Sequence, residues 1–160
     1  MQGLTSLQTL YISQCSSLIC LPQSMKCLTA LETLLIDNCE NLNLRMEEDG
    51  KDTQFCLQIL ILGELPKLVD FARWLLQGST NSLQSLGLGP CQNLKELPVC
   101  LSNVRSLQQL GIADCGEVGD RCERETGQDW YRIAHIPQII INGIAINQLD
   151  DDYVIMIFFI

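Results

Sequence analysis

The sequence predicts an α/β solenoid, a fold in which similar units stack side by side and share one hydrophobic core. One short pattern, Leu-x-x-Leu-x-Leu-x-x-Cys with Ile allowed at its third apolar position, occurs four times in the 160 residues, and a fifth copy at residues 57–65 ends in Leu instead of Cys. Its second leucine stands at positions 10, 34, 60, 86 and 110, so the copies are 24, 26, 26 and 24 residues apart. The hydrophobic fraction of 47% supplies enough apolar side chains for a continuous core.

The pattern and its period are those of leucine-rich repeats. The Leu-x-Leu centre of each copy alternates with a period of two, which predicts a short strand with its leucines facing inward. The expected strands cover residues 9–13, 33–37, 58–62, 84–88 and 108–112. The predicted architecture is a leucine-rich-repeat horseshoe of about five repeats, with a parallel sheet on its concave face and a cap strand at its C-terminal end.

The second half of each repeat is expected to return along the convex side. In the first repeat, Pro22 interrupts any regular helix. In the third, residues 73–76 predict a short helix that Gly78 ends. The second repeat contains a surplus polar stretch at residues 45–52, which indicates a surface loop.

The repeat pattern stops after Cys115, as expected where a cap closes the core. We expect a short helix carrying Trp130 and Ile133, then a strand at residues 138–142. The predicted division is residues 1–118 for the repeats, 119–143 for the cap and 144–160 for a divergent tail. The last eight residues, Tyr153-Val-Ile-Met-Ile-Phe-Phe-Ile160, are too few to span a bilayer, and packing on the cap, weak anchoring and aggregation remain alternatives for them.

The net charge of −9 disfavours non-specific binding to nucleic acid or to an anionic membrane, because both need a basic patch. Acidic residues gather at 47–49, 114–129 and 150–152; we interpret them as solvated surface, with a docking site for a basic partner as the alternative. The chain shows no signal-peptide pattern, no membrane span and no Asn-x-Ser/Thr glycosylation site. These features predict a cytoplasmic protein.

Four of the nine cysteines, Cys15, Cys39, Cys91 and Cys115, hold the same position in their repeats. The chain turns out of the strand there, so we expect small thiols that point inward and pack as apolar groups. The other five are irregularly placed and no Cys-x-x-Cys occurs, which disfavours a disulfide framework or a zinc site.

Residues that alternate with the inward leucines are expected on the concave face. The predicted protein-binding residues on the first three strands are Thr9, Tyr11, Ser13, Thr33, Leu35, Asp37, Ile59 and Ile61. Four of them, Tyr11, Leu35, Ile59 and Ile61, form an apolar stripe of the kind that often marks an interaction site. The alternative is that these side chains pack against one another or against a neighbouring domain.

No catalytic or cofactor-binding pattern is present. The chain contains neither a phosphate-binding Gly-x-x-x-x-Gly-Lys-Ser/Thr loop nor Gly-x-Gly-x-x-Gly. Its single histidine, His135, lies in an apolar stretch and is interpreted as a structural imidazole. A ligase with Cys122 as its nucleophile is disfavoured because no activating partner is evident. We therefore expect no enzyme activity, cofactor or metal.

The cap gives the sequence a recognisable relative. The string from Arg121-Cys-Glu-Arg-Glu-Thr-Gly-Gln-Asp-Trp130 to Ile133-Ala-His-Ile-Pro137 resembles the end of the repeat domain in plant intracellular disease-resistance receptors of the coiled-coil, nucleotide-binding, leucine-rich-repeat class. Leu10-Tyr-Ile-Ser-Gln-Cys15 and Leu97-Pro-Val-Cys-Leu101 are also typical of that class. The resemblance covers residues 4 to about 143.

The resemblance implies a role in plant innate immunity, in which the repeats sense a pathogen effector or a guarded host protein and restrain a nucleotide-binding domain. This chain contains no nucleotide-binding domain and opens directly in a repeat, so we expect a fragment or a truncated receptor, with Leu7, Leu10 and Ile12 at a bare edge. The alternative is a general cytosolic leucine-rich-repeat scaffold or a ubiquitin-ligase substrate adaptor. The identity of the recognised protein does not follow from the sequence.

Overall fold

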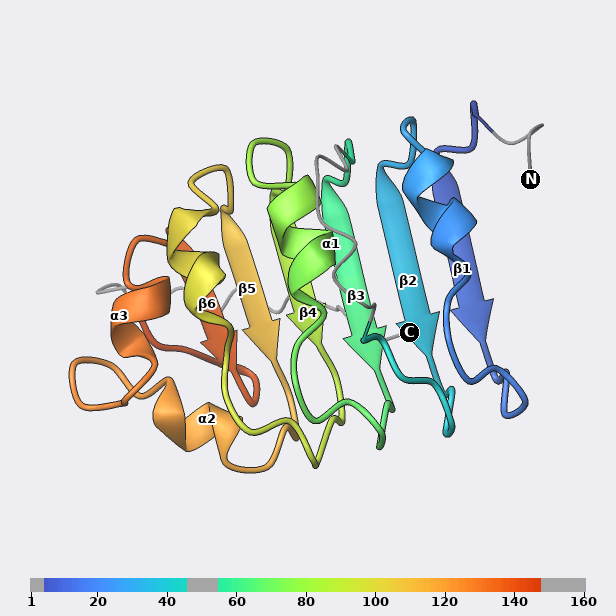
Figure 1. The fold of residues 1–160 in the computed structure, drawn as a ribbon. Coiled ribbons are helices and arrows are strands. Elements are labelled where there is room, and N and C mark those ends of the chain that lie inside the picture. The colour runs from blue at the N-terminus through green and yellow to red at the C-terminus, as the bar shows by residue number, and fades with distance from the viewer. Residues whose placement is uncertain (1–4, 46–54, 148–160) are drawn as a thin grey trace.

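Each of the five copies of the leucine pattern supplies one strand of a single open sheet (Figure 1). The computed structural model describes residues 5–45 and 55–147. Its strands are β1 (Thr9–Ser13), β2 (Thr33–Asp37), β3 (Ile59–Gly63), β4 (Ser85–Leu88), β5 (Gln109–Ile112), β6 (Gln138–Ile141) and β7 (Ile144–Ala145). The sequence-predicted strands are confirmed to within one residue at each end.

The seven strands follow one another in chain order, and β1 to β6 pair in parallel. Leu10 pairs with Leu34 and Leu34 with Leu60, and the same register runs on through Leu86 and Leu110 to Ile139. One position in every copy of the pattern therefore forms a continuous ladder across the sheet. This open and mostly parallel sheet is compatible with the predicted α/β solenoid.

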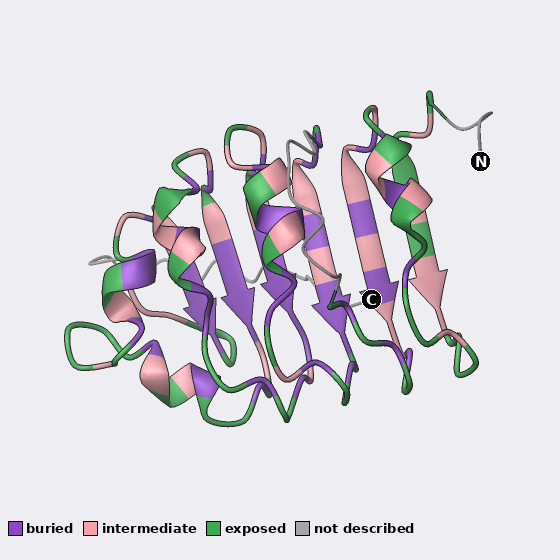
Figure 2. Ribbon diagram, in the orientation of Figure 1, coloured by how far each residue is buried: buried purple, intermediate pink, exposed green. Residues whose placement is uncertain are grey.

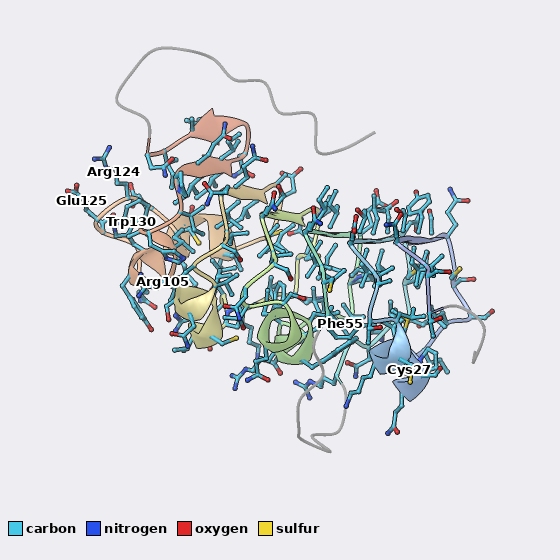
Figure 3. All side chains as sticks on the ribbon, turned by 90° about the horizontal axis from the view of Figure 1, so that it is seen from above. Cys27, Phe55, Arg105, Arg124, Glu125 and Trp130 are labelled. Atoms are coloured by element: carbon cyan, nitrogen blue, oxygen red, sulfur yellow. The ribbon has the colours of Figure 1, made fainter. Side chains whose placement is uncertain are left out.

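Short helices cover one face of the sheet. They are η1 (Gln23–Cys27), α1 (Arg73–Gly78), η2 (Val99–Asn103), α2 (Val118–Arg121) and α3 (Trp130–Ile133). Viewed along the sheet, η1, α1 and η2 lie on the same side of β1 to β5 (Figure 3). We call the opposite side of the sheet, which carries none of the described helices, the open face. The predicted helix at residues 73–76 is confirmed by α1, and Pro22 stands directly before η1.

The inward leucines form the core between sheet and helices. Leu34, Leu60 and Leu86 are completely buried, and Leu110 is nearly so. The edge strand β1 differs, since none of its residues is fully buried (Figure 2). Its Leu10 and Ile12 are only partly buried. Among the described strands β1 has a neighbour on one side alone, which explains why its inward residues keep some exposure.

The cap continues the repeat geometry instead of ending it. Ile136, Ile139 and Ile141 repeat the leucine spacing and are buried, so β6 extends the core by one more strand. A left-handed backbone follows β1, β2, β3 and β6 directly and β5 after one further residue, with φ between 47° and 55° at Gln14, Asn38, Glu64, Asn142 and Asp114. The predicted cap strand is confirmed at residues 138–141, and β7 pairs with it in antiparallel fashion.

The predicted helix carrying Trp130 and Ile133 is confirmed by α3, whereas helix α2 was not anticipated. Most of the predicted loop at 45–52 and of the predicted tail at 144–160 lies outside the described residues. No helix in the described ranges is long and apolar enough to cross a membrane.

Candidate protein-binding face

All eight predicted binding residues lie on β1, β2 and β3, and register places them in three rows across the open face. Thr9, Thr33 and Ile59 form the first row, and Tyr11, Leu35 and Ile61 form the second. Ser13 and Asp37 begin the third, which continues at Gly63. Parallel pairing without any shift produces these rows, because equal positions in successive repeats become lateral neighbours. Their binding role is untested by this geometry and remains a prediction.

The middle row, Tyr11, Leu35 and Ile61, is apolar, and we call it the apolar row. Tyr11 is 59% exposed, and Leu35 and Ile61 are half-buried. The inward residues beside them on β2 and β3, such as Leu34 and Leu60, are fully buried, so the alternation separates core from surface. Three neighbouring large side chains therefore form a continuous apolar strip on a face that none of the described helices covers.

The apolar row ends at β3 because glycine occupies the same position in the next two strands. Ile61 pairs with Gly87, and Gly87 pairs with Gly111. The flanking first row continues here with the polar residues Ser85 and Gln109, whose side chains are 3.2 Å apart, Ser85 Oγ to Gln109 Oε1. The open face is thus apolar over β1 to β3 and lacks large side chains in the middle of β4 and β5.

Asp37 is the only charged residue within the described strands. Its Oδ1 lies 2.7 Å from the point where a Cβ at Gly63 would stand, so the carboxylate leans over β3 into space that glycine leaves free. No hydrogen bond or ion pair to this carboxylate occurs in the described part of the chain. A half-buried, unpaired negative charge thus adjoins the apolar row.

Further carboxylates follow the strands. Glu64 comes directly after β3 and Asp114 two residues after the end of β5, and both are exposed. We call Asp37, Glu64 and Asp114 the acidic rim. Neither the described strands nor the single residue that follows each of them includes a lysine or an arginine. This edge of the open face therefore carries charge of one sign.

The repeated cysteine position marks the turn out of each strand. A backbone N–H three residues later donates to the carbonyl at this position in all five repeats, as from Leu42 to Cys39 and from Leu68 to Leu65. Cys39, Cys91 and Cys115 are buried as predicted, but the prediction for Cys15 was wrong because this thiol is exposed. Cys15 follows β1, which pairs with only one other described strand, so fewer described residues cover this thiol.

Three of the four buried thiols have a raised pKa, and the exception is Cys115, whose pKa is lowered by its hydrogen bond with Cys91. Burial raises the pKa of Cys39, and a hydrogen bond with Cys115 together with burial raises the pKa of Cys91. Burial, with a smaller contribution from Asp129, raises the pKa of Cys122 to about 12. A thiol with so high a pKa stays protonated near neutral pH, and only the thiolate is a good nucleophile. The Nε2 atom of His135 lies 3.2 Å from the carbonyl oxygen of Val104, consistent with the expected structural imidazole.

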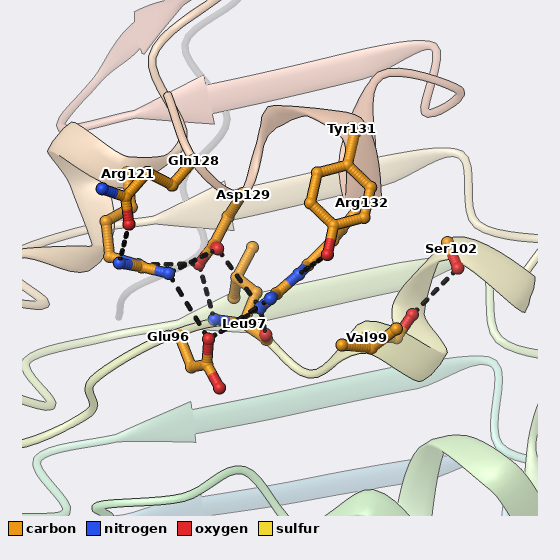
Figure 4. A network of polar contacts seen from close by, with 9 residues as sticks. All are labelled: Glu96, Leu97, Val99, Ser102, Arg121, Gln128, Asp129, Tyr131 and Arg132. Atoms are coloured by element: carbon orange, nitrogen blue, oxygen red, sulfur yellow. Dashed lines mark hydrogen bonds and ion pairs between the residues drawn. The ribbon is translucent and has the colours of Figure 1, made fainter. Parts of the chain in front are cut away.

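The cap contains a buried polar network that the sequence interpretation missed (Figure 4). We assigned the acidic stretch 114–129 to solvated surface, which is wrong for Asp129, since its side chain is fully buried. Arg121 donates to Asp129 through Nε at 3.1 Å and Nη2 at 2.8 Å, and Nη1 of Arg132 forms an ion pair with it at 3.2 Å. The hydrogen bonds from Arg121 to Asp129 raise the pKa of Arg121. In the sequence, Asp129 lies between Arg121 and Arg132, and this arrangement could have indicated a buried ion-pair network in the cap.

A shallow hollow of about 490 Å³ also lies in the cap, between α2 and the β6–β7 hairpin. Its lining combines three isoleucines with Asp120, Glu123 and Arg124. Within the described ranges, no group of three or more His, Cys, Asp or Glu side chains is arranged to hold a metal ion. We therefore take the open face of the sheet as the candidate site.

Comparison with known proteins confirms the resemblance to plant disease resistance proteins. The putative disease resistance protein RGA4 of Solanum bulbocastanum is 44% identical over 52 residues, which are 32% of this chain and 5% of that protein. Disease resistance protein RPP8 of Arabidopsis thaliana is 31% identical over 77 residues, 48% of this chain and 8% of that protein. The matched segments thus span a small part of these relatives. No family model matches the chain, and no solved structure matches it significantly.

Proposed function

We propose that this chain is a leucine-rich-repeat horseshoe of about five repeats that acts as a non-catalytic recognition module in plant defence. Its expected partner is a protein, either a pathogen effector or a guarded host protein. In a full-length receptor the nucleotide-binding domain is a second expected partner, and the expected location is the cytoplasm. The similarity to disease resistance proteins supports the defence role, although it covers only 5% and 8% of the two relatives described.

The observation that carries the proposal is the apolar row. Tyr11, Leu35 and Ile61 are adjacent through strand register and lie on the face that the described helices leave uncovered. Aromatic and aliphatic side chains held on rigid strands lose little conformational entropy on binding, so they serve well as anchors. Thr9, Ser13, Thr33, Asp37 and Ile59 surround them and complete the proposed contact surface.

The test places a charge in the apolar row. Tyr11→Asp and Ile61→Asp should each abolish partner binding, because an uncompensated carboxylate at the centre of an interface must be desolvated. The matched control is Val99→Asp, which adds the same charge at a residue 55% exposed on η2, on the other side of the sheet.

The three variants and the wild type would be expressed in leaf cells as proximity-labelling fusions, with and without infection. Circular dichroism melts of the purified chains verify that each variant is folded. We expect the labelled protein set of the wild type to persist in Val99→Asp and to disappear in the other two. Unchanged labelling by folded Tyr11→Asp and Ile61→Asp would show that the open face is not the binding surface.

A further inference from the structure

The apolar row and the acidic rim lie side by side on the open face, and one kind of partner segment could contact both. The apolar row runs across the middle of β1, β2 and β3, and Asp37 lies two residues beyond Leu35 on β2. Successive residues of a strand advance by about 3.3 Å, so the rim begins about 7 Å from the apolar row. An apolar side chain and a neighbouring charged side chain of one segment can reach both.

The charge of this region is uncompensated within the described chain. Glu64 and Asp114, like Asp37, form no side-chain hydrogen bond or ion pair among the described residues. The basic residues of the cap are committed elsewhere, since Arg121 pairs with Asp129 and Glu96. The unpaired carboxylates therefore present a negative potential beside the apolar row, and a partner of opposite sign gains from it.

The surface changes beyond β3. Gly87 and Gly111, which continue the line of the apolar row in β4 and β5, are buried. The polar pair Ser85 and Gln109 lies beside them and offers hydrogen-bonding groups. A segment lying across the strands would therefore place its apolar side chains over β1 to β3.

We propose that the open face selects a basic amphipathic segment of its protein partner, whose apolar side chains cover the apolar row while its lysines or arginines pair with the acidic rim. This inference rests on the proposed function and adds the chemistry of the partner to it. A purely apolar segment would leave the carboxylate of Asp37 covered and unpaired, and an acidic segment would be repelled by the rim.

The test uses three short dye-labelled peptides with the same apolar residues and with lysine, glutamine or glutamate at every other position. Fluorescence anisotropy measures their affinity for the full chain at low and high salt. We expect the affinities to fall in the order lysine, glutamine, glutamate. Added salt should weaken the lysine peptide most, because it screens partly exposed ion pairs.

Two variants then locate the effect. The double substitution Asp37→Asn with Glu64→Gln should weaken the lysine peptide about tenfold and remove most of its salt dependence, since two partly desolvated pairs are lost. The matched control, Glu117→Gln with Asp120→Asn, removes the same charge from exposed residues near α2 and should change the affinity less than about twofold. Leu35→Ser should weaken all three peptides, because the apolar contact is common to them.

The results separate the two proposals. Three results would overturn the basic-segment inference. They are an equal loss of lysine-peptide affinity in the two double variants, an equal affinity of the wild type for the three peptides, or no binding of the lysine peptide. Loss of labelling in Tyr11→Asp and Ile61→Asp would still support protein binding at the open face in that case. If Leu35→Ser binds all three peptides as tightly as the wild type does, the open face is not the binding surface.

Discussion

The fully buried carboxylate of Asp129 accepts a hydrogen bond from the backbone N–H of Leu97, 32 residues earlier in the chain, at 3.0 Å. Arg132 donates to the carbonyl oxygen of the same Leu97 and, at 3.2 Å, to Glu96. Both polar groups of one backbone residue in the fourth repeat are thus bound by side chains of the cap. Charge-assisted hydrogen bonds of this kind are stronger than neutral ones, so the network fixes the cap to the repeats.

Removal of the buried charge should therefore loosen the cap. We expect Asp129→Asn to lower the free energy of unfolding by about 3 kcal/mol, because it leaves two guanidinium groups without their shared partner. Urea denaturation followed by circular dichroism measures the change. The control Asp120→Asn removes an exposed carboxylate of α2 and should stay within about 0.5 kcal/mol of the wild type. A wild-type midpoint for Asp129→Asn would contradict a structural role for the network.

The ladder of inward leucines should be weaker at the sheet edge than at its centre. Leu60→Ala removes a completely buried side chain from β3 and should cost about 3 kcal/mol, by lost transfer energy and the cavity left behind. Leu10→Ala, at the equivalent position of β1, should cost about 1 kcal/mol because that side chain is already partly exposed. Urea titrations of the two variants compare them, and equal losses would show that β1 is covered as completely as β3.

Two glycines of the cap should respond to alanine for different reasons. A Cβ at Gly127 would lie 2.3 Å from the carbonyl oxygen of Arg121 and 2.6 Å from the backbone nitrogen of Glu123. Gly127→Ala therefore has to displace backbone beside the Asp129 network, and we expect a loss of about 3 kcal/mol. A Cβ at Gly143 meets nothing within 4 Å, but φ is +81° there, so Gly143→Ala should cost about 1 kcal/mol in backbone strain.

Thermal melts of these two variants provide the measurement. The larger decrease in Tm should belong to Gly127→Ala, and its melt should also lose cooperativity if the cap separates from the repeats first. A reversed order would mean that the backbone around residue 121 adapts without cost.

The thiols should differ in reactivity with their exposure. Iodoacetamide at pH 8 should label Cys15, Cys20, Cys27 and Cys56, which are exposed, and should leave Cys39, Cys91, Cys115 and Cys122 unlabelled in the folded chain. A raised pKa means less thiolate at a given pH, so Cys122, with a pKa of about 12, should resist alkylation until the pH approaches that value. Peptide mass spectrometry before and after denaturation provides the readout, and rapid labelling of Cys122 at pH 8 would contradict its burial.

Much of the fold could be predicted because the same local pattern recurs in every repeat. The period-two leucines placed β1 to β5 within one residue, and the equal spacing of the copies predicted parallel pairing in register. The prediction was wrong where a residue's environment depends on its neighbours. Cys15 shares its sequence context with Cys39 but is exposed, since no described strand pairs with the outer edge of β1.

The candidate face also has features that could be predicted from the sequence and features that could not. Alternation along each strand was enough to predict that Tyr11, Leu35 and Ile61 share one side of the sheet. The position of the Asp37 carboxylate over Gly63 was not predictable, because it depends on the exact register of β2 against β3 and on the space that a glycine leaves. The hydrogen bond between Asp129 and Leu97 was not predictable for a similar reason, since Leu97 is 32 residues away and contributes only its backbone N–H.

Local sequence was enough to predict the repeat, the inward leucines, the strand positions and the resemblance to plant disease resistance proteins, because each depends on residues close together in the chain. Which carboxylates are buried or unpaired, and which cysteine of the repeats is exposed, could be learned only from the tertiary structure. These properties arise from contacts between residues more than 20 positions apart, as between Asp37 and Gly63 or Leu97 and Asp129, and chain folding creates such contacts only when the repeats stack.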